Sequence, residues 1–87
     1  MSILKVSIKQ IKAARELLGW SQEAMAEASG VSIPTIKRLE AAGDELGGRP
    51  ETGDKIISAL VKGGVEFIAE NGGGPGVRLR KPKRKSK

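Results

Sequence analysis

The 87-residue sequence contains no cysteine, histidine or tyrosine, and it has one tryptophan and one phenylalanine. Without cysteine, no disulfide can stabilise a small fold and no thiolate can bind zinc. Without histidine, Cys/His zinc sites and the Ser-His-Asp and Cys-His catalytic arrangements are excluded. Packing, with or without a partner chain, must therefore hold the fold together. We expect no metal and no other cofactor.

Long apolar runs are also lacking. No stretch approaches the roughly 20 apolar residues of a membrane span. The first five residues do not form the apolar core of a signal peptide. The absence of cysteine also suits a reducing compartment. We therefore expect one small, soluble, cytoplasmic domain with no membrane partner.

Basic residues are concentrated at the C-terminal end. The net charge is +6, and seven of the 16 lysines and arginines lie in residues 78–87, which contain no acidic residue. The rest of the chain carries nine basic and ten acidic side chains, so this end supplies the whole positive excess. Such a segment either keeps a disordered end in solution or binds nucleic acid through its phosphates. Charge alone does not distinguish these roles.

Four helices are predicted from apolar residues at helical spacing and from capping residues. They cover residues 8–18, the stretch between Ser21 and Gly30, about 33–41, and about 53–62. The N-caps are Ser7, Ser21, Ser32 and Thr52, and the terminating glycines are Gly19, Gly30, Gly43 and Gly63.

A polar loop is expected over residues 44–51, and a β-hairpin after the last helix. Residues 65–69 are typical of a short strand, and residues 77–80 alternate apolar and basic side chains, as in a strand with one solvated face. The predicted organisation is a helical domain over residues 1–63, a hairpin extension over 64–80, and a basic disordered tail over 81–87.

The segment 22–39 carries the most information. Two short helices are joined there by the turn Gly30-Val31-Ser32, and so short a connection makes helices cross steeply. Ala26 must be small because the helices approach each other there, and Gly30 must adopt a positive φ. Val31 and Ile36 would fill the space between the two helices.

This segment resembles the helix-turn-helix of the lambda-repressor/Cro group, the XRE family. The resemblance lies in Ser21-Gln-Glu-Ala-Met-Ala26, Gly30-Val-Ser32 and Thr35-Ile-Lys-Arg-Leu-Glu40, and it extends over residues 8–62. It implies a mainly α, four-helix lambda-repressor-like DNA-binding domain with the hairpin as an extension. Two departures are Ser29, where the family usually has a large apolar residue, and Pro34, where a polar base-reading residue is common.

The resemblance further implies a sequence-specific DNA-binding transcriptional regulator, a repressor, that binds double-stranded DNA as a homodimer. Symmetric dimers are common in this class because one short helix contacts too few bases. The exposed edges of the hairpin could pair with a second chain.

Two charged residues are expected on apolar helix faces. Arg15 follows Ile11 by four residues, and Glu40 follows Ile36 by four. A charge on such a face needs a partner, unless each side chain reaches solvent separately. We predict a structural ion pair between Arg15 and Glu40, which the resemblance also implies. Breaking it should cost about 2–3 kcal/mol.

DNA contacts are expected mainly from the third helix, about 33–41, whose N-terminal end enters the major groove in this motif. Arg38 is the candidate for a bidentate contact to guanine, and Lys37 for a phosphate contact. Ile33 or Pro34 would pack on a thymine methyl group. Residues at helix N-termini would bind phosphate oxygens, and the resemblance supports this role for Gln22. The expected contact residues are Gln22, Ser32, Ile33, Pro34, Thr35, Lys37 and Arg38.

The sequence also allows other functions. Lys37 and Arg38 could simply form a solvated helix face. An antitoxin, or another protein–protein interaction module that binds a partner protein, is the alternative function, and an acidic excess on the fourth helix would favour it. An enzyme is not expected, because no catalytic constellation is present.

Deleting residues 81–87 should weaken binding to all DNA sequences alike, because a basic tail binds phosphates and not bases. The salt dependence of the affinity should flatten, as fewer counterions are released. Titrations of specific and unrelated duplexes at several salt concentrations measure both effects. An unchanged salt slope would rule out a phosphate-binding tail.

Overall fold

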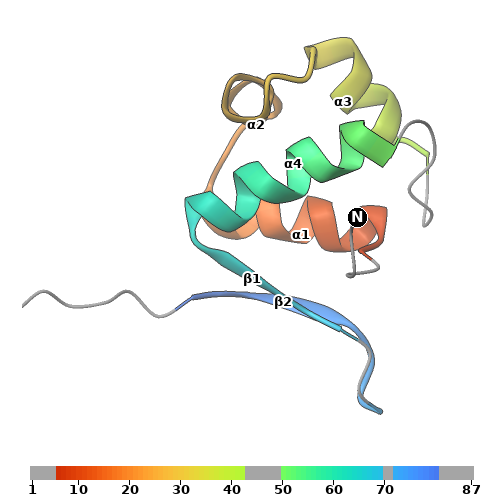
Figure 1. The fold of residues 1–87 in the computed structure, drawn as a ribbon, viewed down its shortest axis with the longest axis vertical. Coiled ribbons are helices and arrows are strands. Elements are labelled where there is room, and N and C mark those ends of the chain that lie inside the picture. Colours follow the sequence, from red (N-terminus) through yellow and green to blue (C-terminus); the bar gives the residue numbers. More distant parts are fainter. Residues whose placement is uncertain (1–5, 43–49, 70–71, 81–87) are drawn as a thin grey trace, which may run out of the picture.

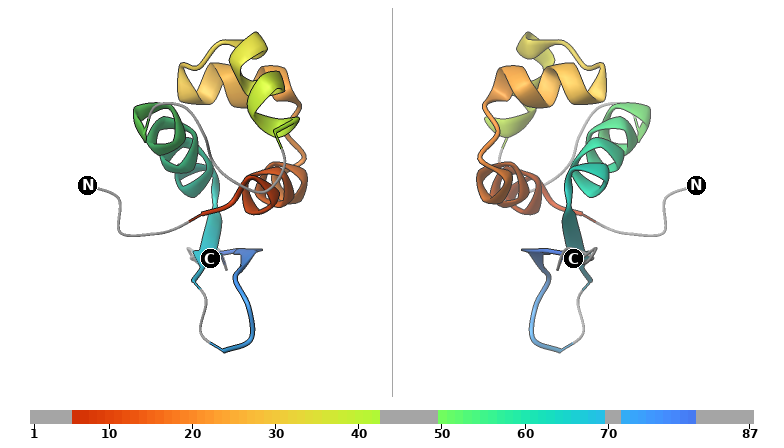
Figure 2. Two further views of the ribbon diagram at one scale, coloured as in Figure 1. Left: turned by 90° about the vertical axis from the view of Figure 1, so that its right-hand side faces the viewer. Right: turned by 90° about the vertical axis from the view of Figure 1, so that its left-hand side faces the viewer.

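The computed structural model describes residues 6–42, 50–69 and 72–80. Its helices are α1 (Ile8–Leu18), α2 (Gln22–Ser29), α3 (Ile33–Glu40) and α4 (Pro50–Gly63), and its strands are β1 (Val65–Ile68) and β2 (Gly76–Leu79). The helices form one packed group, and the hairpin lies against α1 and α4, on the side of the molecule away from α3 (Figures 1 and 2). The predicted mainly α fold with a C-terminal hairpin is confirmed.

Serine residues begin the first three helices as the sequence predicts. In each case the serine Oγ accepts a hydrogen bond from the backbone N–H three residues further on, which satisfies one free donor of the first turn. The caps are Ser7, Ser21 and Ser32. Helices α1 and α2 end at Gly19 and Gly30, whose φ angles of 71° and 78° favour glycine. Local chemistry therefore sets these boundaries.

The start of α4 differs from the prediction. The helix begins at Pro50, so Thr52 lies inside its first turn and does not cap it, and the loop expected over 44–51 ends earlier. Proline is favourable at the first helical position, because an N–H there would have no hydrogen-bond partner within the helix. The regular part of α3 ends at Glu40, and Gly43, its predicted terminator, lies outside the described residues.

The core lies between the helices and one face of the hairpin. Seven large side chains are fully buried, and they come from four helices and one strand. They are Ile8, Ile11, Met25, Ile36, Ile56, Leu60 and Val65. Within the described residues, every buried side-chain nitrogen or oxygen has a hydrogen-bond partner. The chain thus buries one apolar cluster without leaving polar groups unsatisfied.

The hairpin is fastened to α1 by a polar contact. The strands are antiparallel, with Phe67 opposite Val77, and their ends differ by one residue from the predicted ones. The side-chain amide of Gln10 donates to the Gly76 carbonyl oxygen at 2.9 Å. The same side chain accepts a hydrogen bond from the backbone N–H of Ser7 in a capping box. Gln10 therefore links the start of α1 to the start of β2.

Replacing Gly63 by alanine should destabilise the fold by about 1–2 kcal/mol, because a methyl group must displace packed side chains. A Cβ there would lie 2.7 Å from Cζ2 of Trp20 and 3.0 Å from Cδ1 of Leu18. Urea unfolding measures the loss, and emission from the only tryptophan should shift with it. Ser58→Ala, an exposed change in the same helix, is the control. Equal stability of both variants would show that the indole is not held in this position.

Candidate nucleic-acid interface

Helices α2 and α3 meet through the turn that the sequence indicates. Val31, in the middle of the turn, is 9% exposed, and Ile36 of α3 is fully buried in the same apolar cluster. In Figure 1, α2 is viewed nearly end-on while α3 runs across the view, so the two helices cross steeply. The left-handed Gly30 makes this direct connection possible.

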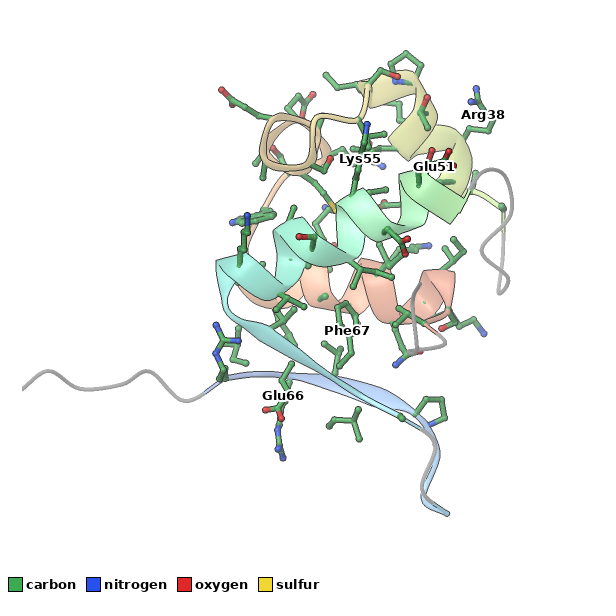
Figure 3. All side chains as sticks on the ribbon, viewed as in Figure 1. Arg38, Glu51, Lys55, Glu66 and Phe67 are labelled. Atoms are coloured by element: carbon green, nitrogen blue, oxygen red, sulfur yellow. The ribbon has the colours of Figure 1, made fainter. Side chains whose placement is uncertain are left out.

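Helix α3 has one buried face and one exposed face. Ile36, Leu39 and Glu40 are buried, whereas Lys37 and Arg38 are exposed. Figure 3 shows Arg38 extending away from the other helices. The side chains of residues 33 and 35 are half-buried and that of Pro34 is exposed. The residues predicted to contact DNA on α3 thus share the accessible side and first turn of one helix, which lies at the edge of the molecule.

The Ser32 hydroxyl is engaged in capping. It accepts a hydrogen bond from the Thr35 N–H at 3.4 Å and donates to Thr35 Oγ1 at 2.9 Å. Both side chains remain at the N-terminal end of α3, where the helix dipole favours an anion. The N–H groups of a first turn lack helical partners, but Pro34 has none to offer. This end of α3 therefore has fewer backbone donors than an ordinary helix start.

The buried face of α3 is tied to α1 by Arg15 and Glu40. Arg15 Nε donates to Glu40 Oε2 at 2.8 Å, and Nη2 donates to Oε1 at 3.0 Å. The third nitrogen, Nη1, donates to the carbonyl oxygen of Trp20 at 2.9 Å. The side chains are 13% and 5% exposed, so two charges share a nearly dry site. This bidentate geometry fixes distance and angle together.

Gln22 joins the same network, a contact that sequence reasoning missed. Its Nε2 donates to Glu40 Oε1 at 3.0 Å, so the amide expected on a phosphate faces the carboxylate. The Glu40 carboxylate therefore accepts hydrogen bonds from α1 and from α2 at once. No local pattern in the sequence indicates this contact. Gln22 and Glu40 are 18 residues apart, and they meet only because α2 and α3 cross.

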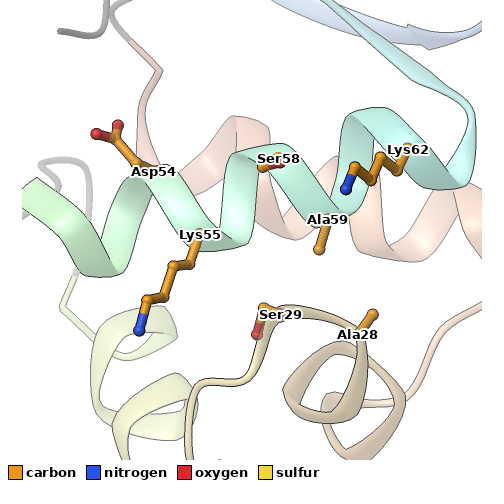
Figure 4. A pocket seen from close by; sticks show the side chains of 7 residues that line it. All are labelled: Ala28, Ser29, Asp54, Lys55, Ser58, Ala59 and Lys62. Atoms are coloured by element: carbon orange, nitrogen blue, oxygen red, sulfur yellow. The ribbon is translucent and has the colours of Figure 1, made fainter.

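A shallow groove separates the end of α2 from α4 (Figure 4). Small side chains form much of its wall, including Ser29, where the family resemblance leads one to expect a large apolar residue. The Ser29 Oγ accepts a hydrogen bond from the Val31 N–H at 3.2 Å, so it supports the turn. The groove is lined by Ala28, Ser29, Asp54, Lys55, Ser58, Ala59 and Lys62. The groove forms because several of the side chains between α2 and α4 are small.

The comparisons with known proteins agree with this geometry. Residues 11–48, from within α1 through α3, match the family model described as Helix-turn-helix. The matched segment, less than half of the chain, supports a DNA-binding helix-turn-helix of the XRE, lambda-repressor-like type. No curated protein matches the chain.

Among the described residues, no helix is long and apolar enough to cross a membrane, and no cluster of acidic side chains could hold a metal ion.

The exposed side chains of α4 include Glu51 and Asp54 beside Lys55 and Lys62. The acidic excess that would favour a basic protein partner is therefore missing from the described part of α4.

Glu40→Ala should destabilise the fold by about 3 kcal/mol, because the buried Arg15 guanidinium then loses two of its three hydrogen bonds. Glu16→Ala is the matched control. Glu16 is 75% exposed and lies 3.8 Å from the same guanidinium, so its loss should cost under about 0.5 kcal/mol. Thermal or urea unfolding compares the two. Similar losses for both variants would contradict a structural role for the pair.

Proposed function

We propose that the protein is a sequence-specific transcriptional repressor whose α3 enters the major groove of its operator. One observation carries the proposal. The face of α3 that bears Lys37 and Arg38 is exposed at the edge of the molecule, while its opposite face is held by Arg15 and Glu40. A major groove about 12 Å wide admits a helix presented in this way.

The proposed contacts divide into base contacts and phosphate contacts. The Arg38 guanidinium presents two parallel donors that suit O6 and N7 of guanine, and the exposed Pro34 ring suits a thymine methyl group. Lys37, next to Arg38 on the helix, suits phosphate. Ile33 and Thr35, half-buried in the first turn, suit an apolar and a backbone contact respectively. Base contacts then set specificity, and phosphate contacts set orientation.

Gln22 takes a modified role in this proposal. Its side-chain amide is bound to Glu40, so the phosphate contact at the start of α2 is made by the backbone N–H groups of the first turn. Gln22 then positions α2 against α3. Ser32 also has a positioning role, because its hydroxyl caps the N-terminus of α3.

Repression follows from occupancy, because a protein seated in the groove of a promoter excludes other proteins from that DNA. One α3 offers few base-contacting side chains, so we propose that two copies bind adjacent half-sites. No cofactor is required for these contacts.

Selection of bound duplexes from a random DNA pool, at about 150 mM salt where non-specific binding is weak, tests the proposal. A palindromic motif should be enriched, and the spacing of its half-sites gives the geometry of the bound dimer. Binding without an enriched motif would reject sequence-specific recognition by α3. The search would then move to a protein partner, as for an antitoxin.

Arg38→Ala should relax the base preference at one position of each half-site and cost about 1–3 kcal/mol of specific binding. The same selection, repeated with the variant, measures the change. Lys12→Ala, an exposed substitution in α1, is the charge-matched control and should leave the motif unaltered. An Arg38 variant that loses affinity without changing its motif would show that this residue contacts phosphate and not a base.

A further inference from the structure

The outer edge of β2 presents backbone groups that the hairpin does not use. The Arg80 N–H donates to the Gly64 carbonyl oxygen at 2.7 Å, so these two opposite residues form a hydrogen-bonded pair. Hydrogen-bonded and non-hydrogen-bonded pairs alternate along an antiparallel ladder. The pairs that contain Val77 and Leu79 are therefore non-hydrogen-bonded. The N–H and C=O groups of Val77 and Leu79 point away from β1, toward the free edge of β2.

The two edges of the hairpin differ in exposure. On β1, the residues with outward-pointing backbone groups are Val65, which is fully buried, and Phe67, which is 8% exposed. On β2, Val77 is half-buried and Leu79 is 50% exposed. The edge of β1 is thus covered by the protein itself, while that of β2 is accessible to another strand.

Exposed apolar side chains are found on β2 and on α1, the helix that packs against it. Leu17 and Leu79, 43% and 50% exposed, are the large hydrophobic residues that the described part of the chain leaves exposed. Helix α1 and β2 run in the same direction from the contact between Gln10 and Gly76 (Figure 1). Leu17 lies seven helical residues beyond Gln10, about 10 Å. Leu79 lies three strand residues beyond Gly76, also about 10 Å.

Contacts at the C-terminal ends of α1 and β2 also show that these two ends lie close together. The Leu18 side chain approaches Gly64, and Gly64 is bonded to Arg80. The end of α1 and the end of β2 therefore meet at one end of the molecule. Leu17 and Leu79, both exposed, thus lie toward this end of α1 and of β2, and the backbone groups of Leu79 belong to the open edge.

We propose that β2 pairs antiparallel with β2 of a second copy of this chain, giving a four-stranded sheet with its twofold axis at Arg78. In this register Val77 lies opposite the partner's Leu79, so the outward N–H and C=O groups of both residues are satisfied in both copies. A register centred on Val77 would require a donor from Pro75, which has no N–H. The proposed register buries Leu79 beside the partner's Val77.

The charges on the outer face tolerate this arrangement. Arg78 would face the partner's Arg78, a like-charge contact that costs some stability. Each Arg78, however, is already paired with Glu66 in its own hairpin, with Nε 3.2 Å from Oε1. Two neutral pairs, and not two free cations, therefore meet at the axis.

The interface leaves α3 free. The twofold axis of a sheet formed in this way is perpendicular to it, so the helices of both copies lie on the same face. Because α3 is on the side of the molecule away from the hairpin (Figures 1 and 2), both copies of α3 would face the same direction. The inference goes beyond the proposed function, since pairing through β2 requires neither DNA nor base recognition.

Single-cysteine variants of the full chain test the register in the absence of DNA. The chain has no native cysteine. Arg78→Cys should form a disulfide-linked dimer readily, because its Cβ would lie about 5 Å from that of the partner's residue 78. Glu66→Cys removes the same ion pair, but its two copies would be three strand spacings apart, about 14 Å. Under mild oxidation it should cross-link at least about tenfold more slowly. Equal cross-linking of the two variants would overturn the register.

Sedimentation equilibrium tests the interface itself. The unmodified chain should be a dimer, and Leu79→Pro should raise the dimer dissociation constant at least about tenfold, because it removes an edge donor that β1 does not use. Leu17→Glu, an exposed change in α1, should weaken the dimer as well, and it keeps the test decisive if the proline variant does not fold. A chain that stays monomeric at about 100 μM, which requires a dimer dissociation constant well above that concentration, would overturn the proposal. So would a dimer that neither substitution weakens.

Discussion

The bidentate contact between Arg15 and Glu40 is the interaction on which the arrangement of the helices depends. The eight residues of α3 are too few to make a stable helix alone, so its direction must come from tertiary contacts. The Glu40 side chain is 5% exposed, and burying a carboxylate is costly unless its oxygens accept hydrogen bonds. The guanidinium of α1 and the Gln22 amide of α2 occupy them. One carboxylate therefore sets the positions of three helices.

This constraint separates the two faces of α3. The inner face packs into the apolar cluster and carries the ion pair, and the outer face carries exposed side chains such as Arg38. The hairpin lies at the other end of the molecule, joined to α1 through Gln10. A surface for DNA and a surface for a second copy can thus coexist in a small chain, because the helical core stands between them.

Local chemistry made much of the fold predictable. The serine caps and terminating glycines mark α1 and α2 because each acts within a few residues of itself. The start of α4 was missed because proline at the first helical position competes with threonine as a start signal, and the sequence offers both at residues 50 and 52. The positions of Arg15 and Glu40 on apolar faces also follow from spacing, which is why the pair could be anticipated.

The sequence by itself determined the helices, the tight turn and the side of α3 that is polar, because these depend on periodicity and on capping within a few residues. Tertiary structure decided what those residues touch. It turned Gln22 toward Glu40, since the crossing angle of α2 and α3 brings together groups that no local pattern relates. It also covered one edge of the hairpin and exposed the other, because the packing of α1 and α4 against the strands, and not the alternation of residues along them, determines which backbone groups reach solvent.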